Sequence, residues 1–303
     1  MFNPNFDLSL VYPQAFPSAN ENEILENFER LADLDVFDVI EITTITHAQL
    51  RKEAEGLLRH TFKAVFFLAG LPSFQAKAFL NAEGEDRLRA VEYTKRLIEE
   101  AAAIGASAIL VVSGPDVPSV HRLASQSRLT NSLVELCEFA NRNFPGIQIR
   151  LEHADREIHR RQLIGPSSNA LEVIGDVAKA GFTLDLNLDL SHILQLGENV
   201  RETLDIAKQF CRHVHLSNCI LSDPTHPLFG DQHPPFGYPG SEVDLAELAK
   251  TIQYLKGLGY LGTNNVTTLG VEVVPLRGED PWENLERAVL AVESATNDAL
   301  GGS

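Results

Sequence analysis

FTLDLNLDL, residues 182–190, alternates apolar and polar side chains along its whole length. Strands that are buried on both faces of a parallel sheet usually read as continuous apolar runs. An extended chain places alternate residues on opposite faces. One face therefore holds three leucines and the other holds acidic and amide side chains: Leu184, Leu186 and Leu188 against Asp185, Asn187 and Asp189. The pattern predicts a strand whose apolar face packs on helices and whose polar face points into a barrel.

The segments on either side of this one have the same alternation. In IQIRLEH, residues 147–153, the polar face ends at Glu152, and in HVHLS, residues 213–217, it includes His215. Charged groups inside a barrel are costly unless they pair with one another or bind a metal ion. These faces therefore indicate either a neutralising ionic network or a metal site.

Strand-like and helix-like segments alternate from one end of the chain to the other. Eight segments read as strands: 7–12, 37–43, 62–69, 107–113, 147–153, 182–190, 213–217 and 270–275. Apolar residues at helical spacing follow each of them. Eight such units predict a single (β/α)8 TIM barrel with parallel strands. Since no proline-, glycine- or serine-rich linker interrupts the pattern, residues 1–303 are expected to form one domain.

Composition narrows the range of partners. The net charge of −17 disfavours nucleic acid and anionic membranes, which attract clustered lysine and arginine. The three cysteines form no C-x-x-C pair, which favours buried free thiols in a reducing compartment. The first residues lack the pattern of a signal peptide, so the cytoplasm is the expected location. We expect a small-molecule substrate, and leave open whether the chain forms a homo-oligomer.

Residues able to bind metal gather at or just after the ends of the last four predicted strands: Glu152, Asp189, His192, His215, Asp231, His233 and Glu272. Active sites of TIM barrels form at these C-terminal strand ends. Carboxylates and imidazoles are ligands for divalent cations. Three polar residues on the inward faces lie deeper, and we expect them to form a buried supporting network: Arg150, Asp185 and His213.

At these positions the chain resembles the xylose isomerase-like TIM-barrel superfamily, which includes sugar phosphate isomerases and epimerases, dehydratases and AP endonucleases of family 2. The matching markers are a glutamate ending the fifth strand, DLSH after the sixth, HVH in the seventh and a glutamate in the eighth. The resemblance implies one divalent metal ion, which would be Mn²⁺, Mg²⁺, Co²⁺ or Zn²⁺. Its ligands would be Glu152, Asp189, His215 and Glu272.

The loop after the seventh strand resembles a metal-binding loop of endonuclease IV. By that resemblance, Asp231 and His233 would bind substrate or, together with His192, a second metal ion. That enzyme also uses histidines from early strands, whereas Ser113 and Gly114 end the fourth strand here. Epimerases of the superfamily carry an arginine at the position of Leu221 and a glutamate at that of Ile158. The substrate contacts of that subgroup therefore cannot be carried over.

The leading hypothesis is a metal-dependent isomerase or epimerase of a small sugar, keto-sugar or sugar phosphate, acting through an enediolate. Glu152 and Glu272 would be the catalytic residues, one removing and one returning a carbon-bound proton. Three arginines lie in the loop after the fifth strand, Arg156, Arg160 and Arg161, and one of them, foremost Arg156, would bind a substrate phosphate or carboxylate. The alternatives are a metal-dependent dehydratase of a polyol or cyclic keto acid, a multi-metal phosphoester hydrolase, and a sugar-binding protein without catalytic activity.

Overall fold

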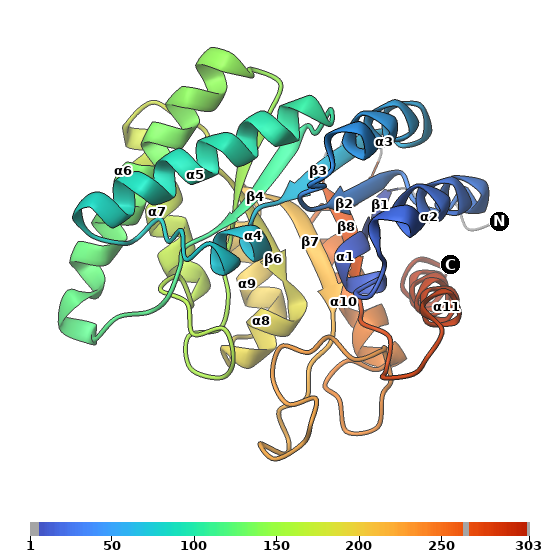
Figure 1. The fold of residues 1–303 in the computed structure, drawn as a ribbon. Helices are drawn as coiled ribbons and strands as arrows, with labels where there is room; N and C mark the ends of the chain where they lie inside the picture. The colour runs from blue at the N-terminus through green and yellow to red at the C-terminus, as the bar shows by residue number, and fades with distance from the viewer. Residues whose placement is uncertain (1–5, 263–266, 302–303) are drawn as a thin grey trace.

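The computed structural model describes residues 6–262 and 267–301 and forms a closed barrel (Figure 1). The barrel consists of eight strands in sequence order, each parallel to both of its neighbours. The strands are β1 (Asp7–Val11), β2 (Val39–Ile42), β3 (Ala64–Leu68), β4 (Ala108–Val112), β5 (Gln148–Glu152), β6 (Asp185–Asp189), β7 (Cys211–Ser217) and β8 (Thr268–Glu272). The predicted (β/α)8 barrel is confirmed. β7 and β8 begin earlier than predicted, at Cys211 and Thr268.

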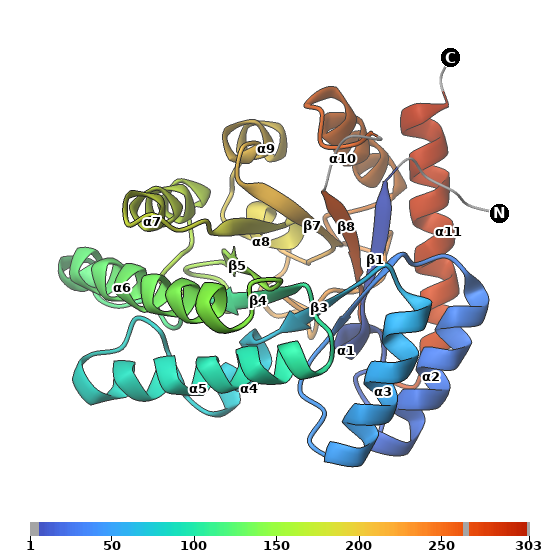
Figure 2. The same cartoon turned by 90° about the horizontal axis from the view of Figure 1, so that it is seen from above.

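A ring of helices surrounds the strands when the barrel is seen from above (Figure 2). The long helices are α2 (Glu21–Leu34), α3 (Ala48–Thr61), α5 (Gly84–Ala103), α6 (Ser119–Asn143), α7 (Ser167–Lys179), α9 (Val200–Ala207), α10 (Leu245–Gly257) and α11 (Pro281–Leu300). Three short helices were not predicted and follow β1, β3 and β6: α1 (Tyr12–Ala15), α4 (Gly70–Gln75) and α8 (Leu190–Gln195). They are too short for helical periodicity to reveal them.

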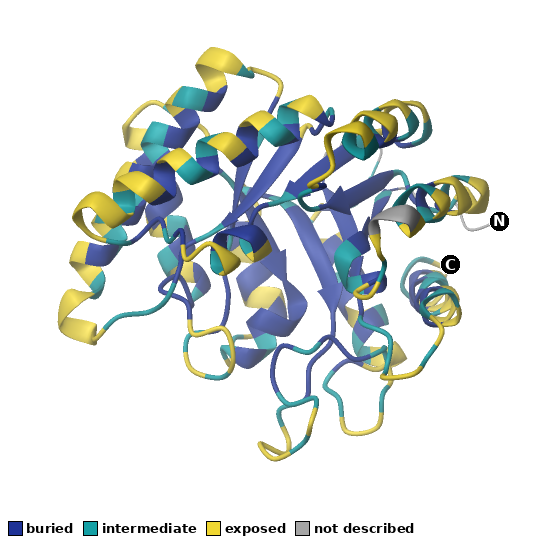
Figure 3. Cartoon of the chain, viewed as in Figure 1, coloured by how far each residue is buried: buried dark blue, intermediate teal, exposed yellow. Residues whose placement is uncertain are grey.

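Alternation along each strand separates the barrel interior from the layer under the helices. Alternate residues such as Ile40 and Ile109 join the main apolar core, which the helices cover. The opposite faces of β2, β3 and β4 contribute a second, small apolar cluster inside the barrel, which includes Phe66 and Leu110. The strands are almost wholly buried, and exposure is confined to the outer helix faces and the loops (Figure 3). No described helix has the length and apolarity needed to cross a membrane.

The longest connection without regular secondary structure joins β7 to α10 and projects beyond the strand ends (Figure 1). Its end is fixed by Asp244, whose side chain accepts a hydrogen bond from the backbone N–H of Glu247 and so caps α10. The middle of the connection returns to the barrel, since the N–H of Val274 donates to the carbonyl of His233 at 2.8 Å.

Gly270 is required by close packing inside the barrel. A Cβ atom at this position would lie 2.7 Å from Glu41 Oε1 and 2.8 Å from His215 Cδ2.

Gly270→Ala is therefore expected to reduce the free energy of unfolding by about 1–3 kcal/mol, measured by urea denaturation in EDTA. Gly175→Ala in α7 is the matched control, because nothing lies near its Cβ position. That change should stabilise the helix by roughly 0.5–1 kcal/mol. Equal effects of the two changes would contradict the close packing.

Candidate metal centre

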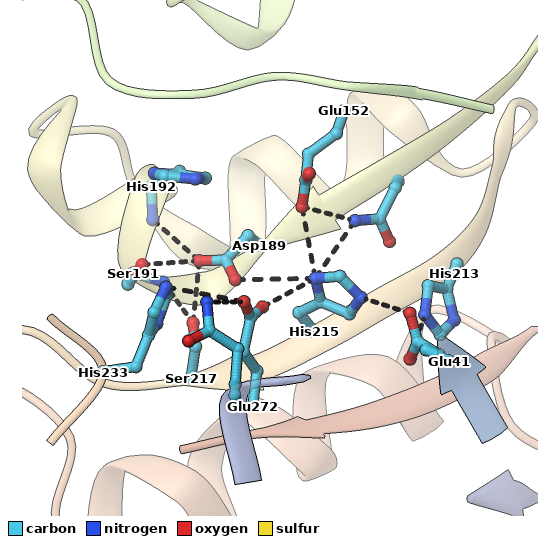
Figure 4. Close-up of polar contacts among 12 residues, drawn as sticks. Glu41, Glu152, Asp189, Ser191, His192, His213, His215, Ser217, His233 and Glu272 are labelled. Carbon is cyan, nitrogen blue, oxygen red and sulfur yellow. Dashed lines mark hydrogen bonds and ion pairs between the residues drawn. The ribbon is translucent and has the colours of Figure 1, made fainter. Parts of the chain in front are cut away.

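Three predicted carboxylates surround one nitrogen of the predicted His215 at the C-terminal end of the barrel (Figure 4). The Nδ1 atom of His215 lies 2.8 Å from Glu272 Oε2, 3.2 Å from Glu152 Oε1 and 3.7 Å from Asp189 Oδ2. One potential ligand atom from each of the four residues lies within 4.8 Å of the others. The sequence markers thus meet in space as the resemblance implies.

Strand register produces this convergence. Asp189 is paired with His215 across β6 and β7, and Glu272 is paired with Ser217 across β7 and β8. Glu152 ends β5, and its Oε1 accepts a hydrogen bond from the buried amide of Asn187 at 2.8 Å. Since all strands are parallel, their last inward-facing residues collect in one layer at the barrel mouth.

Asp189 and Glu272 are each held by hydrogen bonds to one carboxylate oxygen, which leaves the other oxygen facing the site. Asp189 Oδ1 accepts from Ser191 Oγ at 2.6 Å, Ser217 Oγ at 2.7 Å and the N–H of His192 at 3.0 Å. Its buried Oδ2 accepts no hydrogen bond, and the buried Oε2 of Glu272 faces His215 Nδ1 at 2.8 Å. Hard, anionic oxygens beside an imidazole nitrogen fit a divalent cation such as Mg²⁺, Mn²⁺, Co²⁺ or Zn²⁺.

Glu41 on β2 supports His215 from below and was not predicted. It is fully buried, and its Oε2 lies 3.0 Å from His215 Nε2 while its Oε1 lies 2.9 Å from His213 Nε2. Ser9 Oγ donates to the same carboxylate at 2.6 Å. A carboxylate on the far nitrogen of a metal-binding histidine fixes its tautomer and turns its other nitrogen toward the metal. Glu41 therefore leaves His215 Nδ1 to face the three carboxylates.

The expected deep network forms in two parts. His213 bonds to Glu41, whereas Arg150 lies 4.0 Å from Asp185, stacks on Phe66 at 4.2 Å and leaves two buried nitrogens without hydrogen bonds. Phe66 also meets the ring of His213 edge-on, so it separates the two parts. The expectation of one network was thus wrong, because it did not include the inward-facing carboxylate of β2.

A second polar group lies beside the first and is centred on the buried Asp231. Its Oδ1 is 3.2 Å from His233 Nε2 and 3.5 Å from His192 Nδ1. His233 Nε2 also lies 3.5 Å from Glu272 Oε1, which joins the two groups. His233 adopts a left-handed backbone conformation with φ of 46°. Such conformations are uncommon outside glycine and are found at functional sites.

The loop after β5 brings Arg160, not Arg156, to this group. The Arg160 guanidinium forms an ion pair with Asp231. Arg156 turns away and donates to the carbonyl of Leu163 at 2.6 Å and to Asn169 Oδ1 at 2.9 Å. Asp155 causes this difference, because its carboxylate accepts from three successive backbone N–H groups and closes a tight turn between the two arginines. Arg156 is not among the residues lining the cavity at the barrel mouth.

Burial and crowding of charge shift the pKa values of the group. Burial alone would lower the pKa of His215, but the charges of Glu41 and Glu272 outweigh it and raise that pKa well above the ordinary value. At His233 the charges of Asp231 and Glu272 likewise outweigh burial, and they raise the pKa of this histidine to about 10. Burial raises the pKa of Glu272, whereas His192 and His233 hold the pKa of Asp189 below its ordinary value despite burial. The chain thus balances its buried carboxylates with protonated histidines.

These groups border a cavity of about 630 Å³. Its lining includes most of the predicted site: Glu152, His192, His215, Asp231, His233 and Glu272. Arg160 and Gln14 line it as well, and Gln14 Nε2 donates to Glu272 Oε1 at 3.2 Å. Gln14 was not predicted as a site residue, because it lies in the unpredicted helix α1.

Removing the charge of Glu41 is expected to weaken cation binding. Glu41→Gln keeps the shape of the side chain but loses the anion that orients His215. The dissociation constant for Mn²⁺ or Zn²⁺, measured by competition with a chromophoric chelator, should rise by about 10–100-fold. Glu135→Gln on α6 is the control, because that carboxylate pairs with Arg87 on the outer helices. Unchanged affinity in a folded Glu41→Gln protein would contradict the role of Glu41.

Cation binding is also expected to release protons and to tighten with rising pH. Since the pKa of His215 is raised, its Nδ1 carries a proton at neutral pH in the metal-free protein. A cation that uses this nitrogen must displace the proton, so proton loss at higher pH favours binding. Calorimetric titrations in buffers of different ionisation enthalpy should give a release of about one proton at pH 7. Binding enthalpies that do not depend on the buffer would contradict this.

The chain matches the family model described as xylose isomerase-like TIM barrel over residues 28–269. No curated protein sequence matches it.

Several solved structures have a similar fold. An L-ribulose 3-epimerase structure is 18% identical, has a TM-score of 0.72 and is matched over 98% of each chain. The IolI protein with a bound zinc atom is 16% identical with a TM-score of 0.69, over 97% of this chain and 98% of that one. The 3-keto-D-glucoside 4-epimerase YcjR from E. coli is 17% identical with a TM-score of 0.67, over 96% and 99%. At these identities the structures show a shared fold, and the family match establishes that the chain belongs to the xylose isomerase-like TIM barrel family.

Proposed function

We propose that this protein is a divalent-cation-dependent isomerase or epimerase of a sugar or keto-sugar. The observation that carries the proposal is the pair of carboxylates, Glu152 and Glu272, which line the cavity on either side of His215 Nδ1. Similar folds include an L-ribulose 3-epimerase and a 3-keto-D-glucoside 4-epimerase, and IolI holds a zinc atom. A non-catalytic sugar-binding protein would have no need for two acid–base groups at a cation site.

Each side chain of the candidate metal centre has its own role in the proposed reaction. Glu152 and Glu272 transfer the carbon-bound proton, one removing it and the other returning it. Burial raises the pKa of Glu272, which suits a carboxyl group that must hold a proton during turnover. Asp189 and His215 complete the cation ligands, and the low pKa of Asp189 keeps that ligand ionised. The bound cation would polarise the substrate carbonyl and stabilise the enediolate left by proton removal.

The group around Asp231 would orient the rest of the polar part of the substrate. His192, Asp231 and His233 all line the cavity and offer donors and acceptors for hydroxyl groups. The ion pair with Arg160 holds Asp231 in place, because it joins the loop after β7 to the loop after β5. We therefore assign this group to substrate binding, and the same residues are the candidates for a second cation.

A dehydratase is the second candidate, and His233 favours it. Its raised pKa, about 10, leaves the imidazole protonated at neutral pH and 3.5 Å from Glu272. A protonated imidazole beside the proton-transfer group is suited to assist the departure of a hydroxyl group. A multi-metal hydrolase is less well supported, because the inward-facing residues that end β3 and β4 are the apolar Leu68 and Val112.

Proton exchange with solvent tests the proposal. The Mn²⁺-loaded protein is incubated in D₂O with a panel of keto-sugars and their glycosides, and the products are followed by NMR and mass spectrometry. We expect deuterium at the carbon next to the carbonyl without loss of water. Glu152→Gln and Glu272→Gln should each lower kcat by about 10²–10⁴-fold, while Asp176→Asn, on the exposed side of α7, should not.

Other outcomes separate the rival reactions. A product that is lighter than the substrate by one water molecule would show that the protein is a dehydratase and not an isomerase. Full activity in both glutamate variants, with the cation still bound, would contradict the assignment of the proton-transfer pair.

A further inference from the structure

The cavity at the barrel mouth has two chemically different halves. The inward-facing residues at the ends of β5 to β8 supply the carboxylates and the histidine of the candidate metal centre. The corresponding residues of β1, β3 and β4 are Val11, Leu68 and Val112, which line the same cavity together with Leu110, one layer deeper on β4. The polar and apolar halves therefore face each other across the barrel.

The apolar half continues outward beyond the strand ends. Phe16 follows α1, Ile45 follows β2, and Leu71 and Phe74 lie on α4, and all four line the cavity. Leu71 is 52% exposed, although it is a large apolar side chain at the rim of a cavity. Exposed apolar surface in a concave site marks a place where a ligand is bound.

The charges of the lining residues do not suit a phosphate group. Among the described residues that line the cavity, Arg160 is the only lysine or arginine. Its guanidinium is already paired with the buried Asp231. His215 and His233 also line the cavity, but they are paired with Glu272 and Asp231, and the remaining charged groups are the carboxylates of Glu152 and Glu272. A phosphate on the substrate would meet carboxylates without a free cationic side chain to bind it.

The size of the cavity favours a substrate that is larger than a free monosaccharide. Its volume of about 630 Å³ falls within the range that drug-sized ligands occupy. A free monosaccharide at the metal centre would leave the apolar wall in contact with water. An apolar group on the substrate would instead bury that wall and gain the hydrophobic contribution of the contact area.

We propose that the substrate is an uncharged sugar-like compound that carries an apolar substituent about the size of an aromatic ring, such as an aryl glycoside of a keto-sugar. The oxygen-rich part lies at the metal centre, and the apolar part lies against Val11, Leu68, Val112 and Phe74. The orientation of the oxygen-rich part rests on the proposed function. The preference for an apolar substituent rests on the cavity wall alone.

Binding of matched glycosides tests the proposal without reference to turnover. Methyl and phenyl β-glycosides of glucose, galactose and xylose are titrated calorimetrically into the protein, both with Mn²⁺ and in EDTA. For at least one sugar, the phenyl glycoside should bind at least tenfold more tightly than the methyl glycoside, a difference of about 1.4 kcal/mol. Glucose 6-phosphate should bind no more tightly than glucose.

Isosteric changes in the wall identify its contribution. Val112→Thr and Leu68→Asn keep the number and branching of the side-chain heavy atoms and add a polar group at positions that are only partly buried. Each should reduce the phenyl-to-methyl preference by at least threefold and leave the methyl glycoside affinity nearly unchanged. Val120→Thr is the matched control, because Val120 lies on α6 and is 81% exposed. It should leave the preference unchanged.

Three results would overturn the proposal: equal affinity for methyl and phenyl glycosides of every sugar, no binding by any glycoside, or tighter binding of the sugar phosphate. A phenyl preference that depends on Val112, with no solvent deuterium entering any substrate, would support this substrate class and contradict the proposed function. Deuterium incorporation into free sugars, without a phenyl preference, would do the reverse.

Discussion

The rest of the site depends on one arrangement, in which three carboxylates meet a single imidazole nitrogen at the end of the barrel. Buried carboxylates repel one another, and removing them from water is costly. The protein meets this cost with serine hydroxyls on Asp189, the Asn187 amide on Glu152 and protonation of the histidines. A divalent cation would replace the proton on His215 and provide a partner for Asp189 Oδ2, which accepts no hydrogen bond.

The need to compensate the buried carboxylates divides the barrel into two halves. Strands β5 to β8 carry the ionic groups, while β3 and β4 keep a small apolar interior around Phe66 and Leu110. Glu41 on β2 extends the ionic half beneath the site, and Gly270 leaves room for its carboxylate. The asymmetry gives the cavity one surface that is suited to proton transfer at a polarised carbonyl and another that is suited to an apolar group.

Much of this could be predicted from the sequence, because alternation along a strand is a local property. The ends of β5, β6 and β8 fixed which carboxylates share the barrel mouth. The role of Glu41 depends on contact between β2 and β7, and the single acidic residue in an otherwise apolar strand gave only a weak signal. The choice of Arg160 over Arg156 depends on the turn that Asp155 closes, which spacing alone does not determine. The helix α1, which supplies Gln14, is too short for helical periodicity to reveal it.

We infer that the carboxylates around His215 Nδ1 bind one divalent cation. Diffraction from crystals grown with Mn²⁺, measured at the manganese absorption edge, would locate that cation. We expect one anomalous peak in contact with His215 Nδ1 and with oxygens of Glu152, Asp189 and Glu272, and the loss of that peak in Asp189→Asn crystals. A peak at another place, or a protein that binds Mn²⁺ equally well after that substitution, would contradict it.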